Sequence, residues 1–302
     1  MLRRNFINSI AVGSSIAALP NEKFLQSNPK NNFNLNYAPH FGMFKNSAGK
    51  NLIDQLNFMA DQGFTAFEDN NLKKRSISDQ EKMASTMAKR NIKMGVFVAH
   101  TIHWKEANLA SGKKEKRNQF LKEIEESVEV AKRINAKWMT VVPGHRDLRL
   151  NISYQQTNVI DSLKYACDIL EPHGLVMVLE PLNFRDHPGL FLTESPQAYE
   201  ICKAVNSKSC KILFDIYHQQ QIQEGNLIPN IDSCWDEISY FQIGDNPGRK
   251  EPTTGEINYK NIFKFIHEKG FTGILGMEHG NAFPGKNGEI KLIESYKKVD
   301  NF

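Results

Sequence analysis

The 302-residue sequence has few cysteines, little excess charge and no apolar run of the roughly 20 residues that a membrane-spanning helix needs. Its four cysteines form no C-x-x-C pair and show no zinc-finger spacing, which argues against a metal finger and predicts free thiols in the core. The net charge is +4, yet residues 31–302 contain 34 basic and 33 acidic residues. This balance leaves no electrostatic excess that would favour nucleic acid as a partner.

The first 30 residues have the composition of an export leader. Arg3-Arg4 precedes a modest apolar stretch over residues 10–19, a pattern typical of twin-arginine signals, and a polar linker follows over residues 21–34. An amphipathic first helical turn is the alternative. We therefore expect residues 1–30 to be a leader and linker and residues 31–302 to be one catalytic domain. The leader predicts export to the periplasm, whereas a non-functional leader would leave the protein in the cytoplasm.

Short apolar runs alternate with longer amphipathic segments from residue 33 onward. The apolar runs predict strands at 33–38, 65–68, 93–99, 138–142, 175–180, 211–215, 238–243 and 273–278. Apolar residues at three- and four-residue spacing predict helices at 51–62, 78–90, 116–135, 154–171, 195–205, 227–235, 259–269 and from about 289. Ser78 is the expected cap of the second helix, and Gly63 and Gly270 lie where helices should stop. This alternation predicts an α/β fold, a single (βα)8 TIM barrel.

Polar side chains follow nearly every predicted strand. In chain order they are His40, Glu68, His100 with His103, His145, Glu180, Asp215 with His218, Gln242, and Glu278 with His279. Barrels of this kind place their chemistry at the carboxyl ends of the strands. We therefore expect these side chains to converge on one rim. Trp104, next to His103, is predicted to form an apolar wall for substrate, with His100 beside it in the pocket.

Four of these side chains come from successive strands and should form an arc. Glu180, Asp215, Gln242 and Glu278 supply three carboxylates and one amide oxygen, which are hard ligands suited to Mn²⁺ or Mg²⁺. Crowded carboxylates would repel one another without a cation between them. We therefore predict one divalent metal ion, with Co²⁺ or Zn²⁺ as alternatives to Mn²⁺ and Mg²⁺. Pairing of each acid with a neighbouring Lys or Arg is the competing interpretation.

Several motifs resemble a known family. They are L-E-P-L-N over 179–183, F-D-I-Y-H over 214–218, FQIGDNPGRKEPTTGEINY over 241–259, and G-M-E over 276–278. The sequence resembles the hydroxypyruvate isomerase group of the xylose-isomerase-like barrels, which are related to ketose 3-epimerases, over most of residues 35–300. The long third motif is the most specific. The resemblance implies that the four arc residues bind one metal ion, that Glu180 and Glu278 act as acid and base, and that His218 and Arg249 contact substrate.

The chemistry of such an arc can also be reasoned from the residues. Moving a carbonyl between adjacent carbons, or inverting a carbon beside it, requires removal of the α proton and stabilisation of an enediolate. A divalent metal would neutralise the developing charge, while Glu180 and Glu278 flank the substrate and transfer the proton. The expected activity is that of a metal-dependent isomerase or epimerase: an intramolecular oxidoreductase of the aldose–ketose type, or a sugar epimerase. Its partner would be a small hydroxy-carbonyl compound or ketose.

Two other classes of protein are also compatible with these residues. An endonuclease-type phosphodiesterase on the same barrel would use His100, His103, His145 and His279 to hold two or three zinc ions. A non-catalytic sugar-binding barrel would need no metal. We expect no nucleic acid partner and no membrane span, and homo-oligomerisation is left open.

Overall fold

The computed structural model describes residues 33–223 and 225–302, so the predicted leader lies outside the described residues. It contains the eight predicted strands, all paired in parallel. They are β1 (Asn36–Ala38), β2 (Ala66–Phe67), β3 (Lys93–Met94), β4 (Trp138–Val141), β5 (Val176–Leu179), β6 (Cys210–Asp215), β7 (Ile238–Gln242) and β8 (Ile274–Gly276). The predicted α/β barrel is confirmed.

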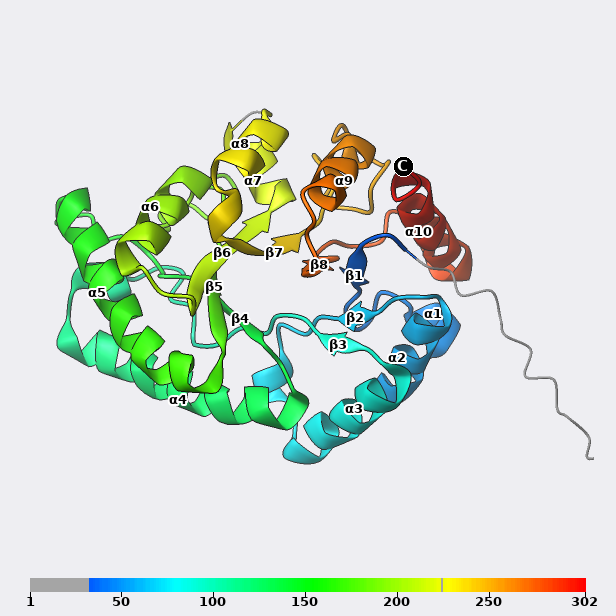
Figure 1. Ribbon diagram of the computed structural model, residues 1–302, viewed down its shortest axis with the longest axis horizontal. Coiled ribbons are helices and arrows are strands. Elements are labelled where there is room, and N and C mark those ends of the chain that lie inside the picture. The colour runs from blue at the N-terminus through cyan, green and yellow to red at the C-terminus, as the bar shows by residue number, and fades with distance from the viewer. Residues whose placement is uncertain (1–32, 224) are drawn as a thin grey trace, which may run out of the picture. The chain divides into compact units, whose positions relative to one another are not determined.

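The strands form a ring that closes through single bridges. Six of them make one sheet in the order β1-β8-β7-β6-β5-β4, and β2 pairs with β3. Isolated parallel bridges, His40 to Glu68 and Val98 to Thr140, join the pair to the larger sheet on either side. The ring lies inside the helices in Figure 1. The carboxyl ends of all eight strands therefore meet at one rim.

The third strand is much shorter than the predicted 93–99, because the chain changes partner part-way along that segment. Gly95 N donates to Phe67 O in β2, whereas Ala99 N donates to Thr140 O in β4. The segment stays extended between these two contacts but belongs to no continuous ladder. Apolar patterning predicts the extended segment, and it contains no information about which neighbour each residue pairs with.

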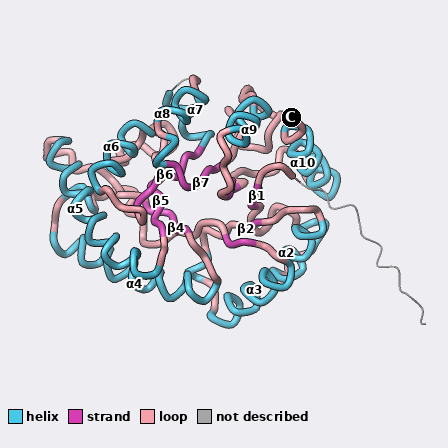
Figure 2. The backbone as a smooth tube through the Cα atoms, viewed as in Figure 1, coloured by secondary structure: helices cyan, strands magenta, loops and turns pink. Residues whose placement is uncertain are grey.

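The helices form an outer layer around the strands (Figure 2). They are α1 (Lys45–Ala48), α2 (Leu52–Asp61), α3 (Ile77–Arg90), α4 (Lys114–Ile134), α5 (Ile152–Leu170), α6 (Ser195–Val205), α7 (Ile216–Gln223), α8 (Leu227–Ser233), α9 (Tyr259–Glu268) and α10 (Gly285–Val299). Short 3₁₀ turns occupy Leu72–Lys74, Leu109–Ser111, Glu171–His173 and Trp235–Glu237. No helix in the described ranges is long and apolar enough to cross a membrane.

The helix ends differ slightly from the predicted ones. The side chain that caps α3 is Ser76, which accepts from Asp79 N, so the expected cap at Ser78 is wrong. Besides glycine, three asparagines end helices in the left-handed conformation: Asn91, Asn135 and Asn206, with φ between 54° and 56°. Asparagine tolerates this conformation better than other residues with a side chain, which explains why these helices stop without glycine.

Two apolar layers hold the barrel together. The larger one lies between the helices and the strands, and the smaller one fills the barrel interior with Ala38, Ala66, Val96, Val176, Val178, Leu213, Tyr240 and Ile274. All four cysteines are buried and free, as predicted. The interior layer is built mostly of small and β-branched side chains, and its one large member, Tyr240, reaches towards the rim that carries the polar residues.

Candidate active site

A cavity of about 660 Å³ opens at the carboxyl ends of the strands. Six residues predicted from the sequence line it: His100, Trp104, Glu180, His218, Arg249 and Glu278. Asn70, Asn71, Lys73, Lys74, Leu182 and His187 also contribute. The predicted convergence on one rim is therefore observed. A cavity of this size is ample for a small organic substrate.

The four predicted metal ligands occupy adjacent places on that rim. Glu180 directly follows β5, Asp215 ends β6 and Gln242 ends β7, where Asp215 and Gln242 are register partners. Glu278 lies two residues beyond Gly276 at the end of β8. Asp215 and Gln242 are each only 1% exposed, and Glu180 is 7% exposed. The barrel thus withdraws two carboxylates and an amide from water, and the side chain of Glu278 beside them is 25% exposed.

The carboxylates at this end of the barrel repel one another strongly. Burial raises the pKa of Glu180 well above its usual range, and Glu278 and Asp215 raise it further. Burial also raises the pKa of Glu278, although the Arg249 guanidinium opposes the rise. Charged carboxylates in this position need a positive partner, because burial and like charges both favour their neutral forms.

Arg249 supplies positive charge from the β7–α9 loop. Its Nη2 donates to Glu278 Oε2 at 2.6 Å and to Asp215 Oδ2 at 3.2 Å. Its guanidinium also lies 4.9 Å from the ring centroid of Tyr217. Glu278 is further held by Asn70, whose Nδ2 donates to Oε1 at 2.8 Å. Arg249 therefore lines the cavity and bridges two of the carboxylates at the same time.

The loop that carries Arg249 is organised by one buried carboxylate. Asp245, 1% exposed, accepts four backbone N–H bonds, from Asn246, Thr254, Gly255 and Ile257, at 2.8–3.1 Å. Arg249 N in turn donates to Asp245 O at 2.7 Å. These bonds tie both ends of the segment 245–257 to one side chain. The sequence motif contains Asp245, but its role as the centre of the loop is visible only in the structure.

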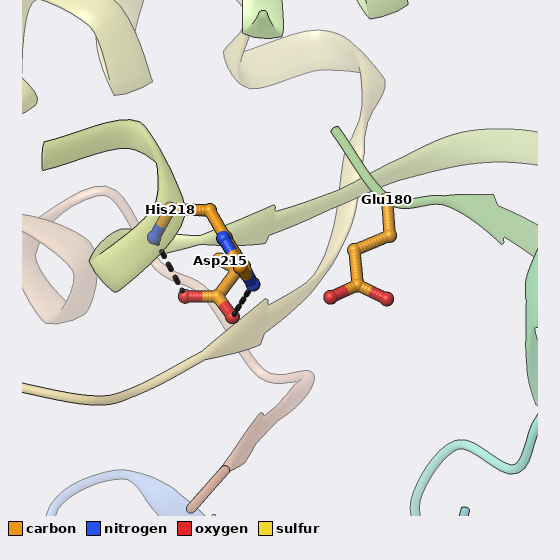
Figure 3. Close-up of side chains that lie close together, drawn as sticks. All are labelled: Glu180, Asp215 and His218. Atoms are coloured by element: carbon orange, nitrogen blue, oxygen red, sulfur yellow. Dashed lines mark hydrogen bonds and ion pairs between the residues drawn. The ribbon is translucent and has the colours of Figure 1, made fainter. Parts of the chain in front are cut away.

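His218 faces the carboxylates from the first turn of α7, and Figure 3 shows it beside Asp215 with the Glu180 carboxylate opposite. One ligand atom from each of these three residues lies within 4.8 Å of the others. His218 Nε2 is 3.7 Å from Asp215 Oδ2 and has no hydrogen-bond partner among the described residues. Burial lowers the pKa of His218 to about 4, so the ring is neutral at pH 7.

The neighbours of His218 determine which ring nitrogen carries its proton. Asn183 Oδ1 accepts from the backbone N–H groups of Arg185 and Asp186, so the Asn183 amide nitrogen must face the histidine. That nitrogen lies 2.7 Å from His218 Nδ1. Nδ1 is therefore an acceptor and Nε2 carries the proton. This tautomer makes His218 a donor towards the cavity, as expected of a substrate contact, and a poor metal ligand.

The remaining predicted histidines have partners of their own. His100 Nε2 accepts from Val142 N at 3.3 Å, and its Nδ1 lies 2.9 Å from Thr101 O. His279 Nε2 lies 2.7 Å from the Tyr296 hydroxyl. His103 pairs with Glu106, and His145 Nδ1 contacts Arg146 O. Within the described residues, Glu180, Asp215 and His218 are the only group of three or more His, Cys, Asp or Glu side chains that could hold a metal.

Trp104 lines the mouth of the cavity and is 45% exposed. Its ring stacks on His187 with the centroids 5.2 Å apart, and His187 lies 5.4 Å from His218. The predicted aromatic wall is thus a pair of rings. His187 gave no sequence signal, because it lies in the loop after β5 and outside any strand end.

The arc fits a divalent cation on chemical grounds. Gln242 Oε1 is buried and has no hydrogen-bond partner among the described residues, although its Nε2 donates to Glu68 at 3.0 Å. An unpartnered buried oxygen is costly unless a cation or a water satisfies it. Three carboxylates beside it supply the negative charge that Mn²⁺ or Mg²⁺ prefers. Glu180, Asp215, Gln242 and Glu278 are therefore a suitable donor set.

Residues 56–298 match the xylose isomerase-like TIM barrel family. The chain belongs to that family. The family resemblance predicted from the motifs over 179–183, 214–218 and 241–259 is confirmed.

Among curated proteins, this family member is similar to hydroxypyruvate isomerase of Escherichia coli, with 32% identity over 161 residues that cover 53% of the chain and 62% of the relative. It is 34% identical over 120 residues to 2-oxo-tetronate isomerase of Cupriavidus necator, covering 40% of the chain and 46% of the relative. The matches thus span less than two thirds of these relatives. A solved 3-keto-D-glucoside 4-epimerase from E. coli superposes with a TM-score of 0.72 at 18% identity, over 87% of the chain and 99% of that protein.

Proposed function

We propose that the protein is a metal-dependent isomerase or epimerase of a small hydroxy-carbonyl compound or ketose. One observation carries the proposal: Glu180, which is buried, and Glu278, whose side chain is 25% exposed, line the same cavity beside Asp215 and Gln242. Buried carboxylates with raised pKa values are suited to taking a proton from carbon and returning it near neutral pH. The names of the curated relatives, which are isomerases, agree with this chemistry.

The proposed mechanism needs acid–base groups and a way to stabilise negative charge. A divalent cation bound by Glu180, Asp215, Gln242 and Glu278 would act as a Lewis acid on the substrate oxygens. Glu180 accepts no hydrogen bond from any described residue, so its carboxylate is free to take up the α proton. Glu278 is held by Arg249 and Asn70, which favours its charged form and fixes its direction. We assign the two proton transfers to these two side chains.

Two further residues would orient the substrate. His218, protonated on Nε2, can donate a hydrogen bond to a substrate oxygen, and Arg249 offers its guanidinium fork to a carboxylate or a pair of hydroxyls. The Trp104–His187 pair supplies an apolar wall at the mouth of the cavity. Together these groups would hold the reacting carbons between the two glutamates. His100 contributes its ring surface, because both ring nitrogens already face backbone atoms.

Metal stoichiometry separates this proposal from the two alternatives. The isomerase or epimerase proposal predicts one Mn²⁺ or Mg²⁺ ion per chain, whereas a multi-zinc phosphodiesterase predicts two or three zinc ions. A sugar-binding barrel would bind its ligand in the presence of a chelator. The positions of the histidines argue against the zinc cluster, because none of His100, His103, His145 and His279 belongs to a group of three or more His, Cys, Asp or Glu side chains close enough to hold a metal within the described residues.

The direct test is conversion of candidate substrates by the metal-loaded protein. The panel should include hydroxypyruvate, a 2-oxo-tetronate and several ketoses, because the curated relatives are named for 2-oxo acids and the fold also supports epimerases. The proposal expects at least one compound to be isomerised or epimerised, and expects a chelator to abolish the reaction. Unchanged turnover after complete metal removal would contradict it.

A further inference from the structure

We propose that Glu68 is a positioning residue that fixes the amide of Gln242 with its oxygen towards the metal ligands. The inference rests on the proposed function, because it takes Gln242 as a ligand of a divalent cation. Glu68 follows β2, on the side of the ring across from β6, and is 2% exposed. It does not line the cavity, so it would act through Gln242 and not on the substrate.

The contacts of Glu68 leave little freedom to either side chain. Tyr240 donates its hydroxyl proton to Glu68 Oε2 at 2.8 Å, and Gln242 Nε2 donates to Glu68 Oε1 at 3.0 Å. Tyr240 and Gln242 lie on the same face of β7, two residues apart, so one carboxylate spans both. Burial and Glu278 raise the pKa of Glu68, whereas these two hydrogen bonds lower it by stabilising the charged carboxylate. That charged carboxylate can only accept hydrogen bonds. It therefore requires the NH₂ group of Gln242 to face it, and the amide oxygen to face away.

That remaining oxygen is the observation that points to a ligand. Gln242 Oε1 is buried without a hydrogen-bond partner among the described residues, next to the register partner Asp215. A rotated amide would present NH₂ to the ligand set and place its oxygen against Glu68, where two acceptors would meet. Glu68 thus selects the one orientation in which Gln242 can donate an electron pair to a cation.

Two glycines make room for this arrangement. A Cβ atom at Gly276 would overlap Glu68 Oε2, and a Cβ atom at Gly95 would overlap the Tyr240 hydroxyl. Gly276 is also the register partner of Gln242 in β8. The absence of side chains at these two positions lets a carboxylate and a phenol enter the barrel beneath the ligands. The geometry therefore comes from residues in, or directly after, the four strands β2, β3, β7 and β8.

The test is a mutant cycle read out by Mn²⁺ affinity, measured by calorimetry and by the electron paramagnetic resonance signal of free Mn²⁺. Glu68→Gln replaces the obligate acceptor with an amide of the same shape, which no longer selects one orientation of Gln242. We expect it to weaken Mn²⁺ binding by about 10–100-fold, as is usual when an outer partner of a ligand is lost. Tyr240→Phe is the matched control, because it removes the other hydrogen bond of Glu68 and should change Mn²⁺ affinity much less.

The second half of the cycle exchanges the acid and the amide between positions 68 and 242. Gln242→Glu alone places two carboxylates face to face and should weaken Mn²⁺ binding, whereas adding Glu68→Gln lets residue 68 donate to the new carboxylate. We therefore expect Glu68→Gln to lower affinity in the parent and to raise it in the Gln242→Glu background. If the Glu68→Gln single variant does not fold, comparing the Mn²⁺ affinity of Gln242→Glu with that of the double variant still tests the inference. Equal Mn²⁺ affinity in those two proteins, or parent affinity in folded Glu68→Gln, would overturn the inference. A parent protein that binds no divalent metal would instead refute the proposed function.

Discussion

The two glutamates proposed to move the proton have different surroundings. Glu278 accepts hydrogen bonds from Arg249 and Asn70, while Glu180 has no hydrogen-bond donor among the described residues. Burial and Glu278 raise the pKa of Glu180 well above its usual range. Burial also raises the pKa of Glu278, but Arg249 and Asn70 oppose that rise, so the two carboxylates differ in how strongly their charged forms are stabilised.

Replacing either glutamate by glutamine should abolish most turnover without unfolding the protein. A positioned acid or base contributes about 10²–10⁴-fold to rate, and loss of a metal-binding carboxylate should add to the effect. We expect Glu180→Gln and Glu278→Gln each to lose several orders of magnitude in kcat while circular dichroism stays unchanged. Full activity in both variants would contradict the two-carboxylate mechanism.

The buried histidine His100 should make the protein sensitive to acid. Burial lowers its pKa to about 4, below the value of about 6.5 expected in the unfolded chain, so only the unfolded state gains a proton over that range. Its contribution to stability is complete above pH 6.5 and is lost as the pH falls to 4, by about 3 kcal/mol. The carboxylates with raised pKa values act in the opposite direction. The contribution of His100 is therefore obtained by comparing the parent protein with a variant that lacks this histidine.

We expect the free energy of unfolding of His100→Gln to depend less on pH than that of the parent between pH 6.5 and 4. Urea titrations at several pH values across this window provide the measurement. Identical pH dependence in the two proteins would mean that His100 is not held neutral.

The ligand arc could be predicted from the sequence because each of its members ends or follows an apolar run. Glu180, Asp215 and Gln242 each stand where a buried strand stops, which is a local signal. The residues that hydrogen-bond to the side chains of the site do not stand at the end of an apolar run. Asn183 and Asn70 reach His218 and Glu278 from loops, and loop conformation depends on tertiary contacts that patterning does not contain.

Among the elements, the β7–α9 loop most directly links fold to site. Asp245 gathers four backbone N–H groups of this loop and so positions Arg249 against Asp215 and Glu278. Hydrogen bonds to a buried carboxylate are stronger than neutral ones, and donors left without an acceptor are costly. The loop should therefore be rigid only while this carboxylate is intact.

Asp245→Asn should destabilise the protein and loosen Arg249. An amide can accept at only one of its two atoms, so two of the four N–H donors lose their acceptor, at a cost of about 2–4 kcal/mol. We expect lower stability in urea together with a raised KM, because Arg249 is proposed to orient substrate. Asp232→Asn, on the exposed surface of α8, is a matched control that should change neither. A normal KM in Asp245→Asn would show that Arg249 is positioned by other contacts.

The elements that sequence patterning missed are short. Helix α7 follows β6 without any loop and carries His218, yet its eight residues give no amphipathic pattern long enough to detect. Strand β3 was predicted over 93–99 but has only two residues, because the chain between 93 and 99 changes neighbours. Long amphipathic helices such as α4 were predicted within two residues of their ends, since tertiary packing and local pattern agree there.

At the scale of the whole molecule, eight repeats of strand and helix define the barrel. A pattern repeated eight times is a strong signal even where single strands are short, and the pairing of β1 with β8 closes the ring as expected. All eight repeats lie within residues 33–302. We propose that residues 1–30 contain a twin-arginine leader that directs export of the folded domain.

Removal of residues 1–30 should leave the domain folded, with an unchanged melting temperature. The full chain should reach the periplasmic fraction of its native cell, whereas a variant with Arg3→Lys and Arg4→Lys should remain in the cytoplasm. Cell fractionation followed by immunoblotting decides between these outcomes. Failure of residues 31–302 to fold, or equal export of both chains, would contradict the leader.

The central claim is that two glutamates transfer a proton at the carbon next to a carbonyl. Incubating the Mn²⁺-loaded protein with hydroxypyruvate, a 2-oxo-tetronate and a panel of ketoses in heavy water tests it most directly, by mass spectrometry and NMR of the recovered compounds. The account predicts deuterium at the α carbon of at least one compound, and none when Glu180 and Glu278 are both glutamine. Conversion of a substrate without any deuterium uptake, or the same uptake in the double variant, would contradict it.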